Sequence, residues 1–142
     1  MKFFRPSKPA RPDLSNALDR LNQLGEGDPS LRDARVREAA RSPEVAVVLL
    51  DVVLGRAAHA DPARSLSAAI RDARAEAEGN GRSLLVVASV VGTAGDPQGL
   101  NGQIATLEAA GATMLPSNAQ AARFAALALR PDQAPALLAG AP

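Results

Sequence analysis

The chain has 142 residues, 16 basic and 15 acidic side chains, a net charge of +1, one histidine and no cysteine. This length suits one domain with a real core, and the balanced charge argues against a general binder of nucleic acid or of membrane surfaces. Without cysteine and with a single histidine, the chain has no disulfides and lacks the usual donors of a zinc site, so we predict no metal.

The N-terminal segment, residues 1–27, is predicted to form an arm and one amphipathic helix. Residues 1–12 hold three prolines and four basic residues and are typical of a flexible arm, although Phe3 and Phe4 could pack on the body or on a partner. The arm lacks the apolar region of a secretory signal, and no stretch of the chain is long enough to span a bilayer. We therefore expect a cytoplasmic protein. Apolar residues recur at helical spacing from Asp13 to Leu24.

Residues 28–130 alternate between helical and strand patterns. Apolar runs rich in β-branched residues predict strands at Val45–Leu54, Ser83–Val91 and Ala112–Leu115. Helices are predicted between them, three of them beginning with the pair Asp-Pro, in which Asp caps the helix and Pro fits the first turn. The predicted helices are Pro29 to about Arg41, Pro62–Glu78, Pro97 to about Ala110 and Asn118 to about Arg130.

This alternation predicts the fold class. The order α-α-β-α-β-α-β-α favours parallel βαβ units with right-handed crossovers, in an α/β fold with a small parallel sheet. Because the strands are apolar throughout, helices should cover both faces of the sheet and give three α/β/α layers. Residues 131–142 are predicted to be a mobile tail.

Three loops should converge at the carboxyl edge of this sheet: Gly55–Asp61, Gly92–Asp96 and Pro116–Asn118. Each leads into a helix N-terminus, where free N–H groups and the helix dipole favour an anion such as phosphate or a carboxylate. No Walker A motif, G-x-G-x-x-G or G-x-S-x-G is present. The candidate ligand-binding residues in these loops are Gly55, Arg56, His59, Gly92, Thr93, Asp96, Gln98, Ser117 and Asn118.

Each candidate side chain also has a simpler structural explanation. His59 is the candidate for acid–base work or phosphoryl acceptance, but a loop histidine that packs or caps is the favoured interpretation. Arg56 could clamp a phosphate or carboxylate, or lie solvated on the surface. Asp51 could be a functional carboxylate, although we expect it to accept from loop N–H groups. Asp61 and Asp96 are expected to be helix caps, and capping also explains Ser117.

Several phrases of the sequence together resemble one known family. LLDVVLG, AHADP, VVASV, GT-x-x-DPQG and PSN, within about Asp28 to Leu129, are similar to the FdrA family, whose members are related to the α subunit of succinyl-CoA synthetase and to NDP-forming acyl-CoA synthetases. The resemblance implies the C-terminal, flavodoxin-like ligase domain of that family. It also implies a subunit of a multi-subunit transferase or ligase. The better-understood relatives make acyl-CoA through a phosphohistidine, and FdrA-type proteins are linked to carbamoyl transfer in ureide breakdown.

The chain departs from the family pattern at the catalytic position. The segment that holds the synthetases' catalytic histidine corresponds to about Pro97–Gln103, which reads PQGLNGQ and has no histidine. His59 lies in the preceding loop, where FdrA-like proteins also have a histidine. Val91 lies where that pattern has a cysteine, and Arg56 where it often has an aromatic residue. We also expect this chain to lack the family's N-terminal CoA-binding Rossmann domain and the first strands of the ligase-type domain.

Two functions follow from these observations. The first is an accessory, non-catalytic domain that binds a partner subunit or a second copy of itself, because the phosphohistidine is missing and a short sheet leaves an edge to cover. The second is a ligand-binding or catalytic subunit of an acyl-CoA ligase or carbamoyltransferase, with a site for phosphate, a nucleotide or CoA at the carboxyl edge. Whether the chain is an enzyme stays open between them.

Overall fold

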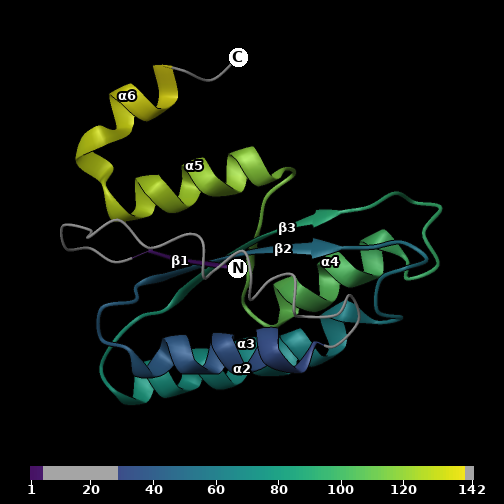
Figure 1. Ribbon diagram of the computed structural model, residues 1–142. Coiled ribbons are helices and arrows are strands. Elements are labelled where there is room, and N and C mark those ends of the chain that lie inside the picture. The colour runs from purple at the N-terminus through teal and green to yellow at the C-terminus, as the bar shows by residue number, and fades with distance from the viewer. Residues whose placement is uncertain (5–28, 140–142) are drawn as a thin grey trace, which may run out of the picture.

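The computed structural model describes residues 1–4 and 29–139 (Figure 1). The helix predicted at Asp13–Leu24 and the cap at Asp28 lie outside these residues. The described elements, in chain order, are β1 (Lys2–Phe4), α2 (Ser30–Arg41), β2 (Val47–Val53), α3 (Pro62–Gly79), β3 (Leu85–Val91), α4 (Leu100–Ala109), β4 (Thr113–Met114), α5 (Asn118–Leu129), the 3-10 turn η1 (Pro131–Gln133) and α6 (Ala134–Ala139).

The sheet has the strand order β1-β2-β3-β4, and β2, β3 and β4 run parallel. This confirms the predicted α/β fold with a small parallel sheet. The long pair in the middle joins β2 to β3 in register from Val47 opposite Leu85 to Val53 opposite Val91. Because side chains alternate along a strand, this register decides which residues share a face.

Strand β1 differs from the prediction of a flexible arm. Lys2–Phe4 pair antiparallel with Val47–Leu49 at the outer side of β2. Without this pairing β2 would present a row of unpaired N–H and C=O groups at the sheet edge, which β1 satisfies over three residues. Three residues are too few to show a period of two, so the sequence pattern gave no sign of this strand.

Helices cover both faces of the sheet, as the apolar strands predicted. Helices α2, α3 and α4 pack on one face, where Val48, Leu50 and Val52 of β2 are buried. Helix α5 packs on the other face, against Val47 and Leu49. Figure 1 shows α2 and α3 below the sheet and α5 above it. The domain therefore has three layers, with three helices on one side and, among the described residues, α5 on the other.

Helix boundaries agree with the sequence signals except at α4. Asp61 caps α3 by accepting from the Arg64 N–H at 3.3 Å, with Pro62 as the first helical residue. Ser117 caps α5 by accepting from the Gln120 N–H at 3.3 Å. Both caps were expected. Helix α4 begins at Leu100 rather than after Asp96.

The C-terminal segment contains regular structure that was not predicted. Pro131–Gln133 form η1 and Ala134–Ala139 form α6, which contacts α5. Pro131 and Pro135 lie in the first turns of these elements, where proline is tolerated. The mobility of the tail stays a prediction. Across residues 1–4 and 29–139, none of the helices combines the length and the apolar character needed to span a bilayer.

Candidate functional site

Three loops lie at the carboxyl edge of the parallel strands. They follow β2, β3 and β4 and lead into α3, α4 and α5 respectively. This edge is the usual place for a ligand in an open α/β sheet. The candidate residues named from the sequence lie in these loops or at the start of α5, except Asp51, which lies within β2. The contacts divide them into three separate groups.

The first group joins the loops after β2 and β3 through Gln98. Its side-chain Oε1 accepts from the Gly55 N–H at 3.2 Å, and its Nε2 donates to the Gly55 carbonyl at 2.7 Å and to the His59 carbonyl at 3.1 Å. A primary amide supplies one acceptor and two donors, and here both ends are used. Gln98 therefore holds the backbone of the neighbouring loop in place.

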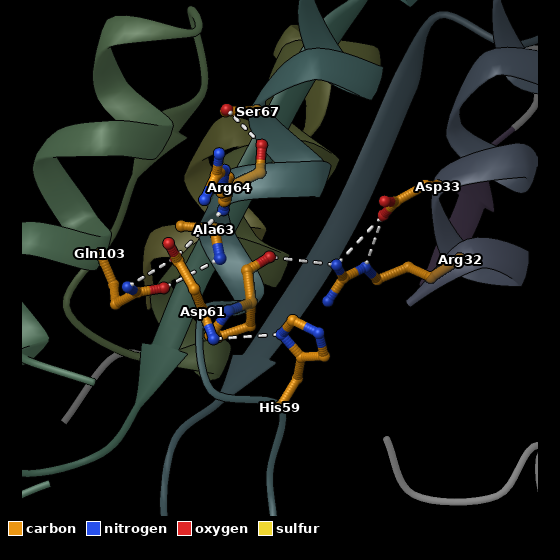
Figure 2. A network of polar contacts seen from close by, with 9 residues as sticks. Arg32, Asp33, His59, Asp61, Ala63, Arg64, Ser67 and Gln103 are labelled. Carbon is orange, nitrogen blue, oxygen red and sulfur yellow. Dashed lines mark hydrogen bonds and ion pairs between the residues drawn. The ribbon is translucent and has the colours of Figure 1, made fainter. Parts of the chain in front are cut away.

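Gln103 extends this group to the N-terminus of α3. Its side chain is buried, with Oε1 accepting from the Ala63 N–H at 2.8 Å and Nε2 donating to Asp61 Oδ1 at 3.0 Å (Figure 2). Nε2 also lies 3.3 Å from the Gln98 carbonyl. Sequence reasoning did not single out Gln103, because a polar residue in the first turn of a helix is usually solvated. We call Gln98, Gln103 and Asp61 the glutamine cluster.

His59 and Arg56 lie in the same loop but have different surroundings. The His59 Nδ1 accepts from the Asp61 N–H at 3.1 Å (Figure 2). A nitrogen that accepts a hydrogen bond carries no proton, so a neutral His59 ring has its proton on Nε2. In this tautomer Nε2 can donate a hydrogen bond but has no free lone pair. Arg56 is exposed and makes no ion pair or hydrogen bond with any residue in the described ranges.

Gly92, Thr93 and Asp96 form a second group within one loop. Asp96 Oδ2 accepts from the Thr93 N–H at 2.6 Å and from Thr93 Oγ1 at 3.3 Å. The carboxylate is therefore turned back into its own loop, which corrects the prediction that it caps α4. The N-cap of α4 is Gly99, whose φ of 74° suits glycine. A Cβ at position 92 would lie 2.9 Å from Leu54 Cβ, so Gly92 permits a close approach of the two loops.

The third group lies on the α5 face of the sheet. Asp51 Oδ1 accepts from Ser89 Oγ at 2.7 Å, and Asp51 Oδ2 accepts from Asn118 Nδ2. Ser89 lies opposite Asp51 in the β2–β3 register and is 1% exposed. Asp51 thus accepts from two side chains, not from loop N–H groups as predicted. Burial lowers the pKa of the Met1 ammonium, and the nearby Asp51 carboxylate opposes that shift.

Side chains accept from the first N–H groups of two of the three helices that begin at this edge. Asp61 and Gln103 accept from the first N–H groups of α3, and Ser117 accepts from α5, whose first residue also contacts Asp51. At α4 no side chain caps the first turn. The edge carries the carboxylates of Asp51, Asp61 and Asp96, whereas the only arginine or lysine in the three loops is Arg56.

Comparison with known proteins identifies a family and a curated relative. The family model described as CoA-ligase matches residues 15–128 of the chain. Over 91 residues the chain is 42% identical to "Uncharacterized protein YahF" of Escherichia coli (strain K12). This match covers 64% of the chain but 18% of YahF, so the chain spans less than a fifth of that relative's length.

Proposed function

Because the chain belongs to the CoA-ligase family, we propose that it is an accessory domain of an acyl-CoA synthetase-related assembly, one that binds a partner chain and carries no phosphohistidine. Within the family we propose the FdrA type, on the sequence phrases given above. The partner is a larger subunit or a second copy of this chain. The short match to YahF, 18% of its length, is consistent with a domain that works beside others.

One observation carries this proposal: at the carboxyl edge the chain's own side chains occupy the first N–H groups of α3 and α5. Gln103 and Asp61 take the first N–H groups of α3, where an anion would otherwise bind. Gln103 also ends the segment that corresponds to the family's histidine loop, and there it serves as a structural hydrogen-bonding residue. The Nδ1 lone pair of His59, which a phosphoryl acceptor would need, accepts from the Asp61 N–H in this conformation.

A thermal-shift series on the purified chain tests the proposal. The ligands are phosphate, carbamoyl phosphate, ATP, ADP and CoA, each added over a wide concentration range. A ligand at about a hundred times its dissociation constant would stabilise the fold by roughly 2.7 kcal/mol, which gives a clear rise in melting temperature in a small domain. We expect no rise with any of the five. A saturating rise with one of them would contradict the accessory function and identify the substrate class.

A ligand-binding function is the second candidate, and the first turn of α4 favours it. The N-cap Gly99 has no side chain to occupy the N–H groups that follow, and the adjoining Asn101 and Gly102 are exposed. A phosphate group of carbamoyl phosphate, a nucleotide or CoA would bind there through backbone N–H groups. In an amide NMR titration with carbamoyl phosphate, saturating shifts confined to residues 100–102 would support this function. Shifts that are absent, or that spread evenly over the surface, would exclude it.

A further inference from the structure

Two valines on the inner strands of the sheet are exposed. Val53 ends β2 and Val91 ends β3, and the register places them opposite one another. They are 57% and 53% exposed, although β2 and β3 are the most apolar segments of the chain. The cause lies in the position of α5, which packs on Val47, Leu49 and Val87 nearer the amino ends of the strands. In Figure 1 the arrowheads of β2 and β3 extend beyond the start of α5.

A carboxylate lies on the same strip of sheet. Asp51 is two residues before Val53, so the two side chains share a face about 7 Å apart along the strand. Ser89 is likewise two residues before Val91 and supports Asp51 from the buried side. We call Asp51, Val53 and Val91 the acidic strip. It combines an apolar surface with one negative charge.

The hydrogen bonds of Asp51 leave room for a further donor. An ionised carboxylate has about two acceptor positions on each oxygen. Oδ1 uses one position for Ser89 and Oδ2 uses one for Asn118, so one position remains on each oxygen. No ion pair within the described ranges involves Asp51, although the Met1 ammonium lies near enough to respond to its charge.

We propose that the acidic strip binds an arginine side chain of the partner chain. The guanidinium offers two parallel N–H groups, which match the one free position on each oxygen of Asp51. Its aliphatic stem lies across Val53 and Val91 and removes their exposed methyl groups from water. A lysine would supply one point charge and would not use both oxygens in this way. This inference rests on the proposed partner-binding function and names the surface and the chemistry that the partner must present.

Methyl NMR tests the inference with a defined probe. The probe is Nα-acetyl-arginine amide, titrated at low ionic strength into protein labelled at valine methyl groups. The matched control is Nα-acetyl-citrulline amide, which has nearly the same shape but no charge. We expect saturating shifts at Val53 and Val91, with a dissociation constant on the order of 1–10 mM. Citrulline should bind about tenfold more weakly, and added salt should weaken the arginine complex.

Two variants locate the binding. Asp51→Asn should weaken binding about tenfold, and Val91→Ser should reduce it while leaving an exposed site that tolerates serine. Glu108→Gln, an exposed carboxylate on α4, should leave it unchanged. Equal shifts with citrulline, or shifts centred elsewhere, would overturn the inference. The ligand series above is independent: stabilisation by CoA or a nucleotide would contradict the accessory function and not the arginine site, whereas failure of the arginine probe would contradict the site alone.

Discussion

The glutamine cluster and the acidic strip lie at the same edge of the sheet and use their polar groups in opposite ways. In the cluster, Gln98 and Gln103 use both their donors and their acceptors within the chain. In the strip, Asp51 keeps one acceptor position on each oxygen, beside two exposed valines. A network whose donors and acceptors are all used within the chain stabilises the loops. A carboxylate with unused acceptor positions can bind a donor from another molecule. The two regions therefore separate a structural role from a binding role within one edge.

The largest effect on stability is expected from opening the cluster. Gln103→Leu keeps the approximate volume but leaves the buried Ala63 N–H without its acceptor and removes a donor from Asp61. Loss of these partners should lower the free energy of unfolding by about 3 kcal/mol. Urea denaturation measures the change. Gln120→Leu, an exposed glutamine on α5, is the control and should shift stability by less than about 0.5 kcal/mol. Equal effects of the two substitutions would mean that the cluster does not stabilise the edge.

Gly92→Ala should have the next largest effect on stability, because it disturbs the close approach of the loops that follow β2 and β3. The added Cβ would lie 2.9 Å from Leu54 Cβ and 2.9 Å from Leu54 Cδ1. Overpacking of this kind costs about 2 kcal/mol. Gly95→Ala lies in the same loop and meets only Thr93 Oγ1 at 3.7 Å, so it should be nearly neutral. Thermal unfolding of both variants tests the pair, and a neutral Gly92→Ala would show that the loops adjust freely.

The substitution Ser89→Ala tests whether Asp51 has a binding role in the acidic strip or a structural role like that of the glutamine cluster. The substitution removes the buried hydroxyl that accompanies Asp51, but Asp51 is exposed and can bind water instead. We expect a loss of about 1 kcal/mol or less in the free energy of unfolding. Binding of the arginine probe should fall more clearly, because Asp51 loses the group that orients it. A loss of stability as large as that of Gln103→Leu would place Asp51 with the structural residues and not with a binding surface.

The sequence predicted the parts of the fold that depend on local patterns. Apolar runs located β2 and β3, and the pairs Asp61-Pro62 and Ser117-Asn118 located the starts of α3 and α5. Strand β1 was not predicted, because three residues are too few to show the alternation of apolar and polar side chains that is typical of a strand. The start of α4 was misplaced because Asp96 bonds to Thr93, a choice of partner that depends on how the loop folds.

The site was harder to predict because its contacts join distant residues. Asp51 and Asn118 are 67 positions apart, and Gln103 lies 40 positions from Ala63. Ser89 is hidden within an apolar strand and acquires its partner only from the β2–β3 register. Composition and spacing identified the loops, whereas the pairing of their side chains required the folded chain.

Substitution of His59 should change the free energy of unfolding least, because His59 lies at the margin of the glutamine cluster. Its Nδ1 accepts from the Asp61 N–H on an exposed part of the loop, where water can replace the lost acceptor. We therefore expect His59→Ala to change the free energy of unfolding by about 0.5 kcal/mol or less. His59→Asn should restore part of that change, because its side-chain oxygen can accept the same N–H. A loss above about 1.5 kcal/mol in urea denaturation, rescued by asparagine, would make His59 a structural member of the cluster. If His59→Ala leaves the free energy of unfolding unchanged, the ring has no structural role. A role of His59 in binding would then be tested by titrating the variant with phosphate and with carbamoyl phosphate.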